Sequence, residues 1–194
     1  YGQLGDGSLV SKCIPVEITS GSSFKLVVGN SVNTTFADNA GSLFATGGNF
    51  SGQYGIGNYN PYPSFSPYNI PGVTNVTAVA VGSAYAIIVK SDGTVWDTGE
   101  NNYGQLGIGT NANINVFTQV PSLTNVKSVA CMDFATIALK NDGNVWSFGS
   151  NAVGQLGDGT NVNKNTPIQV GSLTSVSAIA CGLDFSLALK SDGT

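Results

Sequence analysis

The chain has 194 residues, of which only 9% are charged; seven lysines are its sole basic residues, histidine is absent, and the net charge is −4. This balance excludes binding to a nucleic-acid backbone through clustered cations, and any mechanism in which a histidine of this chain acts as a base or metal ligand. The 26 glycines disfavour a helical bundle, while the 41% of apolar residues disfavours disorder.

A repeat of about fifty residues is the strongest signal in the sequence. The dipeptide Gly-Gln recurs at spacings of 50, 52 and 50 residues, at Gly2-Gln3, Gly52-Gln53, Gly104-Gln105 and Gly154-Gln155. The second interval is longer because the loop between Gly57 and Asn75 is enlarged. We interpret the chain as a single segment of four repeats, with approximate bounds 1–51, 52–103, 104–153 and 154–194.

The third repeat shows the predicted elements in chain order. Its Gly-Gln turn is followed by four apolar stretches expected to be strands, at 117–120, 126–132, 136–140 and 145–148. The pair Asp142-Gly143 between two of them predicts a type I′ hairpin, which places Gly143 and its equivalents Gly93 and Gly193 at positive φ. Applied to every repeat, this pattern gives 15 strands rather than 16, because one Val-Trp strand is missing.

Alternation with period two predicts which side chains form the core. The expected core residues occupy one face of equivalent strands: Ile87, Val89, Ile137, Leu139, Leu187 and Leu189. The preceding strands contain small residues such as Ala130 and Cys131, which suit strands that converge on a crowded axis. These features predict an all-β fold, a β-propeller of four-stranded antiparallel blades; a solenoid is the rival, but its repeats are usually shorter.

Two motifs give the sequence a family resemblance. Gly-x-Asn-x-x-Gly-Gln-Leu-Gly-x-Gly occupies 99–109 and 149–159, and it recurs at 47–57 with tyrosine in place of leucine. Asp-Gly-x-Val-Trp stands at 92–96 and 142–146. The chain resembles the regulator-of-chromosome-condensation repeat family over its whole length. This resemblance implies a seven-bladed propeller, of which four repeats would form an arc with exposed edges at both ends.

The resemblance carries an activity less well than a fold. The family's founding member promotes nucleotide exchange on the small GTPase Ran and binds chromatin. Family repeats often carry a histidine before the third strand, where this chain has Tyr85, Ala135 and Phe185. No basic chromatin-binding surface is present either, so guanine-nucleotide exchange is kept only as a second alternative.

The recurring turns and their acids are interpreted as structural. The Gly-Gln turns lack the following helix and lysine of a phosphate loop, so Gly52, Gln53, Gly104, Gln105, Gly154 and Gln155 are expected to shape loops. The aspartates lie in turns without the spacing of a calcium site. Three cysteines predict free thiols, with Cys131 and Cys181 buried and Cys13 exposed. We therefore expect no catalytic residue, metal site or cofactor, and no enzyme.

One irregular loop is the candidate binding site. It gathers four aromatic side chains without charge: Tyr59, Tyr62, Phe65 and Tyr68. Rigid aromatic residues on loops are common anchors of binding faces, although they can equally cover a blade edge. The leading hypothesis is a non-enzymatic binding or scaffold module that engages a protein partner through such loops. Further copies of the chain could pair at open blade edges.

Compartment is weakly indicated. The uncharged stretch 39–89 is interrupted by four prolines, so we expect no membrane insertion. Low charge and many Asn, Thr and Gly residues favour, as the first alternative, a structural component of a bacterial surface or extracellular assembly. Secretion or display on a bacterial cell surface would follow from it.

Overall fold

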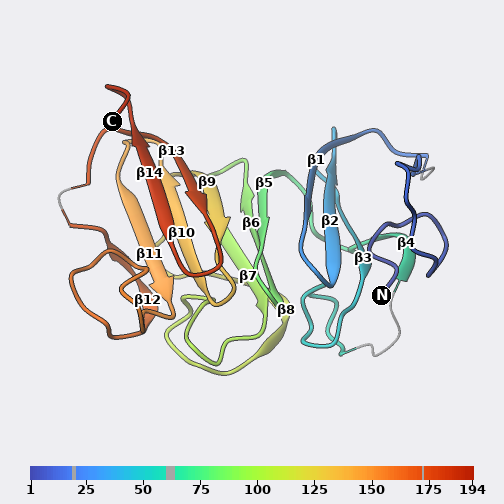
Figure 1. Cartoon of the computed structure of the whole chain (residues 1–194), viewed down its shortest axis with the longest axis horizontal. Helices are drawn as coiled ribbons and strands as arrows, with labels where there is room; N and C mark the ends of the chain where they lie inside the picture. The colour runs from blue at the N-terminus through green and yellow to red at the C-terminus, as the bar shows by residue number, and fades with distance from the viewer. Residues whose placement is uncertain (19–20, 60–63, 172) are drawn as a thin grey trace.

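Four antiparallel sheets succeed one another along the chain in a computed structural model, which describes residues 1–18, 21–59, 64–171 and 173–194 (Figure 1). The first sheet contains β1 (Phe24–Gly29), β2 (Asn33–Asp38), β3 (Leu43–Gly47) and β4 (Ser64–Asn69). The second contains β5 (Val76–Val81), β6 (Tyr85–Lys90), β7 (Val95–Gly99) and β8 (Ile114–Gln119). The third contains β9 (Val126–Cys131), β10 (Ala135–Lys140), β11 (Val145–Gly149) and β12 (Lys164–Gln169), and the fourth contains β13 (Val176–Cys181) and β14 (Ser186–Lys190).

The predicted all-β fold of four-stranded antiparallel sheets is confirmed, and the described residues form no helix. Consequently, the part of the chain that the structure describes offers no helix of membrane-spanning length. Each complete sheet joins strands from two consecutive Gly-Gln repeats. For example, β8 follows Gly104-Gln105 in sequence but pairs with β7, where Trp96 lies opposite Gln119. A sheet is therefore offset from the sequence repeat by one strand.

The expected count of 15 strands is wrong, because the described residues contain 14. The absent strand would follow Gly2-Gln3, where the described residues 8–18 form no ladder. In the other repeats this strand pairs with a Val-Trp type strand that precedes the Gly-Gln turn. The 194 residues hold no such strand before Gly2, so the segment has no ladder to join.

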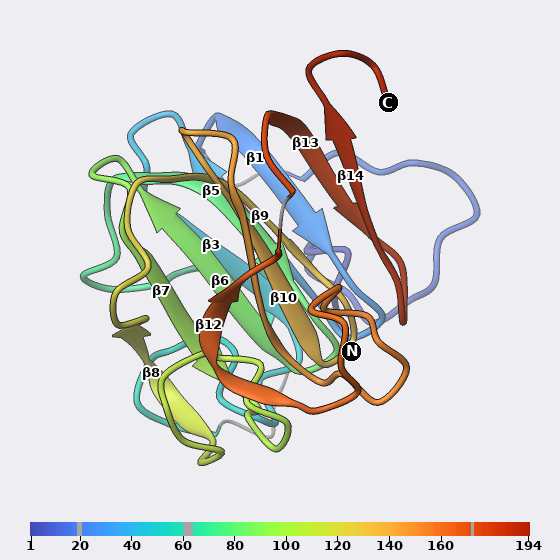
Figure 2. The ribbon, with the colours of Figure 1, turned by 90° about the vertical axis from the view of Figure 1, so that its left-hand side faces the viewer.

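The central strands are buried on both faces. Ile87, Val89, Ile137 and Leu139 are at most 2% exposed, as the alternation predicts. Their neighbours on the opposite face, such as Thr136 and Ala138, are buried as well, because each inner sheet is covered on both sides by adjacent sheets. The expected burial of Leu187 and Leu189 is wrong: they are 60% and 48% exposed. They lie on β14, in the two-stranded sheet that β13 and β14 form at the C-terminal end of the chain (Figure 2).

The Asp-Gly turns have the predicted glycine but a different turn type. Gly93, Gly143 and Gly193 have φ of 77°, 81° and 90°, which confirms positive φ. A type I′ turn would also require positive φ at Asp92, which is not among the described residues with that conformation. Instead, Gly93 N donates to Lys90 O at 2.8 Å and Lys90 N donates to the Thr94 carbonyl at 3.0 Å. This is a type I turn followed by a glycine bulge.

The side chain of Asp92 explains why this turn forms in place of a type I′ turn. Asp92 Oδ1 accepts hydrogen bonds from Thr94 N at 2.9 Å and from Thr94 Oγ1 at 2.7 Å. The same aspartate-to-threonine bonds recur at Asp192. They cap the turn with the aspartate in an ordinary backbone conformation, so only the glycine takes positive φ.

The inner strands β1, β5, β9 and β13 lie side by side, as the small residues on β9 and β13 predict. Backbone hydrogen bonds join their turns: Ser83 N donates to Asp133 O at 3.1 Å, and Asp133 N donates to Leu183 O at 3.3 Å. The three cysteines are free thiols; Cys13 is exposed, but Cys131 and Cys181 are only partly buried.

Truncation of a central leucine tests the register. Leu139→Ala removes a fully buried side chain from β10, so the free energy of unfolding should fall by about 2–5 kcal/mol. Leu189→Ala is the matched control at the equivalent, half-exposed position of β14, and it should cost less than about 1 kcal/mol. Urea denaturation of both variants measures the difference. Equal losses would contradict the burial assigned to the two strands.

Candidate functional site

One end of the sheets gathers two kinds of connection. Because the strands alternate in direction, the turns 30–32, 82–84, 132–134 and 182–185 lie at the same end as the Gly-Gln loops 48–59, 100–113 and 150–163. This end is at the bottom of Figure 1, opposite the C-terminus. We call it the turn face. The Asp-Gly hairpins and the connections that lead into β5, β9 and β13 lie at the other end.

Each Gly-Gln loop is tied together by its own amide side chains. Gly52, Gly104 and Gly154 have φ of 79°, 82° and 80°, a conformation that favours glycine. The side-chain oxygens of the glutamines that follow them accept hydrogen bonds from the backbone two residues earlier. Asn101 Oδ1 accepts from Leu106 N at 3.0 Å, and its Nδ2 donates to Thr110 O at 2.8 Å. These bonds account for the recurrence of Gly-x-Asn-x-x-Gly-Gln.

The same loops bind neighbouring sheets together. Gly57 N donates to Asn115 O, and Gly109 N donates to Asn165 O, both at 2.7 Å. A Cβ at Gly52 would lie 2.6 Å from Cβ of Asn115, and one at Gly104 would lie 2.6 Å from Cα of Asn165. Glycine is required here because each loop passes against the outer strand of the next sheet.

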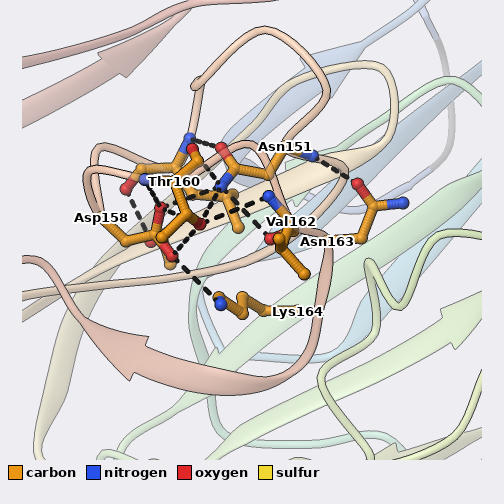
Figure 3. Close-up of polar contacts among 8 residues, drawn as sticks. Asn151, Asp158, Thr160, Val162, Asn163 and Lys164 are labelled. Carbon is orange, nitrogen blue, oxygen red and sulfur yellow. Dashed lines mark hydrogen bonds and ion pairs between the residues drawn. The ribbon is translucent and has the colours of Figure 1, made fainter.

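The fourth Gly-Gln loop contains a closed polar cluster (Figure 3). Asp158 Oδ1 accepts from Thr160 N at 2.9 Å and from Asn151 Nδ2 at 2.9 Å, while Lys164 Nζ lies 3.3 Å from Oδ2. Partial desolvation opposes ionisation of Asp158, but its hydrogen bonds outweigh it and lower the pKa to about 2. The described residues contain no group of three metal-ligating side chains. The cluster therefore holds the loop with its charges already neutralised.

Only strong acid should loosen this loop. Asp158 has an ordinary pKa of 3.8 and a folded pKa of about 2, so its stabilising bonds are intact above the ordinary value and are lost as pH falls through the folded one. Asp158→Ala should therefore raise the exchange rate of the Thr160 amide hydrogen several-fold at neutral pH. NMR hydrogen exchange measures this. Asp6→Ala, in the first loop, is the control and should leave the exchange rate of the Thr160 amide unchanged. If Asp158→Ala also leaves that rate unchanged, the cluster does not order the backbone.

The predicted aromatic residues do not form one cluster among the described residues. Tyr59 is 50% exposed beside Gly52, and a Cβ there would lie 3.2 Å from Cε1 of Tyr59. Phe65 is 38% exposed and lies against Gly2 of the preceding loop, while Tyr68, 45% exposed, pairs with Ala45 in the sheet. Tyr62 lies outside the described residues. The rings of these three described residues make no contact with one another.

Two further aromatic contacts on the turn face were missed by sequence reasoning. The rings of Tyr103 and Phe134 lie 5.0 Å apart with an interplanar angle of 46°, and those of Tyr1 and Phe50 lie 5.4 Å apart. Tyr1, Tyr103 and Val153 all precede the glycine of a Gly-Gln pair, and all are at least 40% exposed. This recurrent position was the signal available in the sequence.

A buried acid lies between the second and third sheets. Asp97 on β7 is fully buried, and neither carboxylate oxygen has a hydrogen-bond partner in the described part of the chain. At the equivalent position of β11, Ser147 Oγ donates to Leu156 O at 2.9 Å. Burial raises the pKa of Asp97 well above its ordinary value, and burial likewise raises the pKa of nearby Tyr85 and Cys131. Burial therefore opposes ionisation of Asp97.

Replacement of Asp97 should stabilise the fold at neutral pH. A raised folded pKa means that the stability from the neutral acid is full below the ordinary value of 3.8 and is lost as pH rises through the folded pKa. Asp97→Ser copies the next repeat, removes this pH dependence and should add about 1–3 kcal/mol near pH 7. Urea denaturation across pH measures both effects. A less stable variant with an unchanged pH profile would contradict the assignment.

The repeated sheets and the loops that join them define a β-propeller repeat protein. Two family models of the regulator of chromosome condensation (RCC1) repeat match this chain. One matches residues 92–139 and 142–189, and the other matches residues 76–105 and 126–155. Together the matched segments extend from 76 to 189, which is more than half of the chain. The chain belongs to the RCC1 repeat family.

Known relatives share part of their length with this chain. The ultraviolet-B receptor UVR8 of Arabidopsis thaliana is 28% identical over 115 residues, covering 57% of this chain and 26% of that protein. The secretion-regulating guanine nucleotide exchange factor of Bos taurus is 33% identical over 111 residues, covering 56% and 24%. The chain thus spans about a quarter of each of these relatives.

Solved structures support the fold. The crystal structure of human WBSCR16 has a TM-score of 0.82 at 25% identity, covering 99% of this chain and 53% of that one. Prp20p from Saccharomyces cerevisiae has a TM-score of 0.76 at 19% identity, covering 85% and 43%. Its structure was described together with its binding properties to Gsp1p and histones.

Proposed function

We propose that this chain is a non-enzymatic part of a β-propeller that engages a protein partner through loops of the turn face. The observation that carries the proposal is the set of exposed apolar side chains on loops that are held rigid by their own hydrogen bonds. Val153 is 67% exposed at the tip of a loop in which Gln155 and Asn151 tie the backbone. Such preorganised anchors bury apolar area with little loss of conformational entropy.

The enlarged segment of the second repeat is our first candidate contact, with Tyr59 in the loop and Phe65 and Tyr68 on the strand β4 that follows it. Tyr59 and Tyr68 present about half of their surface to solvent, and Phe65 somewhat less. The backbone of Phe65 is already used, because its carbonyl accepts a hydrogen bond from Gly7 N at 2.8 Å. Its ring remains free to contribute to an interface, so binding and packing are not exclusive at this residue.

Relatives give this proposal its family context. A solved structure shows Kap60 bound to the yeast RCC1 protein Prp20, and Prp20p is described with binding to Gsp1p and histones. Protein binding is therefore a known use of this fold. The relatives and structures named here come from plants, mammals and yeast, which lends no support to a bacterial surface or extracellular assembly.

Removal of the aromatic side chains tests the proposal. A partner recovered on the immobilised chain and identified by mass spectrometry should bind a Tyr59→Ala, Phe65→Ala, Tyr68→Ala variant at least tenfold more weakly, because truncated aromatic anchors typically cost more than 1 kcal/mol. Val27→Ala is the control, since Val27 is 65% exposed on β1, at the opposite edge of the first sheet from β4. Interferometry measures the affinities. Undiminished binding of the triple variant would remove the loop from the interface.

The open strand β14 requires a second control. Its edge and its exposed residues Leu187 and Leu189 could pair with another copy of the chain. Light scattering over a range of concentrations separates such self-association from capture of a different protein.

Guanine-nucleotide exchange is a second candidate. The bovine relative that is 33% identical over 111 residues bears that function in its name. Release of fluorescent GDP from small GTPases, measured with and without the chain, tests it directly. If the chain accelerates GDP release from none of the GTPases tested, nucleotide exchange is rejected and only the binding role stands.

A further inference from the structure

The strand β14 has a free edge at one end of the series of sheets. Among the described residues it pairs with β13 alone, whereas the corresponding strands β2, β6 and β10 each have a second neighbour. Lys190 N points to the free side, because it donates to Thr194 O at 2.7 Å. Backbone groups alternate in direction along an antiparallel strand, so Ser186 and Ala188 direct their N–H and C=O groups to the same side. The edge is therefore open to a further antiparallel strand.

A small apolar cavity lies beside this edge. It has a volume of about 130 Å³ between the third sheet and β14, and its lining includes Leu156, Gly157 and Ala188. The corresponding space between the second and third sheets is filled by Phe148 of β11, which is fully buried. Phe148 packs against Gly107, the counterpart of Gly157, because a Cβ at Gly107 would lie 2.8 Å from its ring. A strand added to β14 would bring side chains into the cavity in the same way.

A second unpaired element lies near the N-terminus. Residues 12–17 correspond in the repeat to the outer strands β8 and β12, and Pro15 stands at the position of Pro167 in β12. They form no ladder with any described residue. Ile14 and Val16 are 70% and 36% exposed. The chain thus presents an apolar segment with the pattern of a strand, as well as an open strand edge.

The Gly-Gln loop before this segment determines where the segment lies. Thr34 Oγ1 donates to Gln3 O at 2.7 Å, just as Thr136 Oγ1 donates to Gln105 O at 3.0 Å. The loop that contains Gln105 is anchored on the third sheet and leads into β8 of the second sheet. By the same geometry, residues 12–17 leave the first sheet toward the position of a preceding sheet, and the described residues contain no sheet there.

The two unpaired elements lie at opposite ends of one molecule. The N-terminal segment and the first sheet are at the right of Figure 1, β13 and β14 are at the left, and the second and third sheets lie between them. A second copy can bring its β14 to residues 12–17. Its exposed Leu187 and Leu189 would then face the first sheet, as their counterparts Ile137 and Leu139 face β13 and β14.

We propose that this chain associates with itself head to tail, with residues 12–17 of one copy added as an antiparallel strand to the free edge of β14 in the next. The two contacting surfaces differ, so the contact is heterologous and can continue from copy to copy. It lies at the ends of the series of sheets, which leaves the turn face accessible. The inference therefore goes beyond the proposed function and does not rest on it.

The pairing of β10 with β11 supplies the register. Thr136 lies opposite Phe148, and Ala138 lies opposite Trp146. Transferred to β14, this register places Val16 opposite Ser186 and Ile14 opposite Ala188. Side chains of directly opposed residues share a face of the sheet, so both aliphatic side chains point to the cavity that Ala188 lines. Pro15 falls between them, where its missing N–H removes no bond to β14.

Light scattering on the 194-residue chain over a range of concentrations tests the proposal. The mass should rise above the 19.8 kDa of a single chain. Ile14→Asp with Val16→Asp should weaken association by about tenfold or more, because a charge is costly in an apolar cavity. Val153→Asp with Val162→Asp adds equal charge at exposed positions near the fourth Gly-Gln turn and should leave association unchanged. A chain that stays single at every concentration would overturn the inference.

A mixing experiment distinguishes this contact from symmetric pairing of two β14 strands. Leu187→Lys with Leu189→Lys adds charge at exposed positions of β14 and should also prevent self-association. When this variant is mixed with Ile14→Asp, Val16→Asp, each chain keeps one intact surface, so complexes with one chain of each should form. The head-to-tail contact is rejected if the mixture does not associate, or if the N-terminal variant alone still does. Thermal melts confirm that each variant is folded.

A disulfide cross-link tests the register separately. Cys13 is an exposed free thiol, and the register places it opposite Leu189 of the next copy. Leu189→Cys should therefore give a pair of chains linked through Cys13 on mild oxidation, seen on a non-reducing gel and assigned by mass spectrometry. Val116→Cys is the control, because Val116 is 49% exposed on β8, away from both ends. Equal linkage of Cys13 in both variants would contradict the register.

Discussion

The fold depends on close contact between each Gly-Gln loop and the outer strand of the following sheet. The hydrogen bonds from Gly57 and Gly109 to the carbonyls of Asn115 and Asn165 fix the spacing of neighbouring sheets at the turn face. The approach is so close that a single methyl group at Gly104 would overlap the backbone of Asn165. Apolar side chains fill the space between the sheets, and this contact fixes how closely the sheets approach at the turn face. The repeated motif therefore encodes how sheets join as well as how a loop turns.

That contact also explains why the turn face suits recognition. A loop that is bound to the next sheet cannot move freely, so side chains at its tip, such as Tyr103 and Val153, are presented in defined positions. The hydrogen-bonded framework uses main-chain atoms and buried amides, which leaves the exposed positions unconstrained by folding. One loop can thus carry an aromatic ring and the next an aliphatic side chain on the same backbone, as these two residues do.

Much of this structure was predictable because its causes are local or repeated. Asp-Gly turns, the central strands through Ile87 and Leu139, and the all-β class follow from turn chemistry and alternation within a few residues. Burial of Leu187 and Leu189 was predicted wrongly because it depends on a neighbouring sheet, which sequence periodicity does not reveal. The turn type was wrong because the capping bonds of Asp92 compete with the geometry that Asp-Gly favours in isolation.

The candidate site was less predictable for a related reason. Sequence reasoning selected the irregular loop with Tyr59 and its neighbours, because irregularity is conspicuous along a chain. The contact between Tyr103 and Phe134 joins residues in different repeats, and the hydrogen bond from Asp133 N to Leu183 O forms only when two inner turns meet. Residues at recurrent positions of different repeats thus form one surface only when the repeats pack together. The sequence of a single repeat does not show this surface.

The one-strand offset between sheet and sequence repeat has a consequence for biosynthesis. Each complete sheet takes its outer strand from the repeat that follows. In the second sheet, for example, this strand is β8, which follows Gly104-Gln105 and pairs with β7. On the ribosome, a sheet would have to wait with an open edge until the start of the next repeat had emerged from the exit tunnel. Each new segment would close the sheet before it and begin one of its own, so that nascent units are fastened together in order and misjoined pairs of distant repeats are disfavoured.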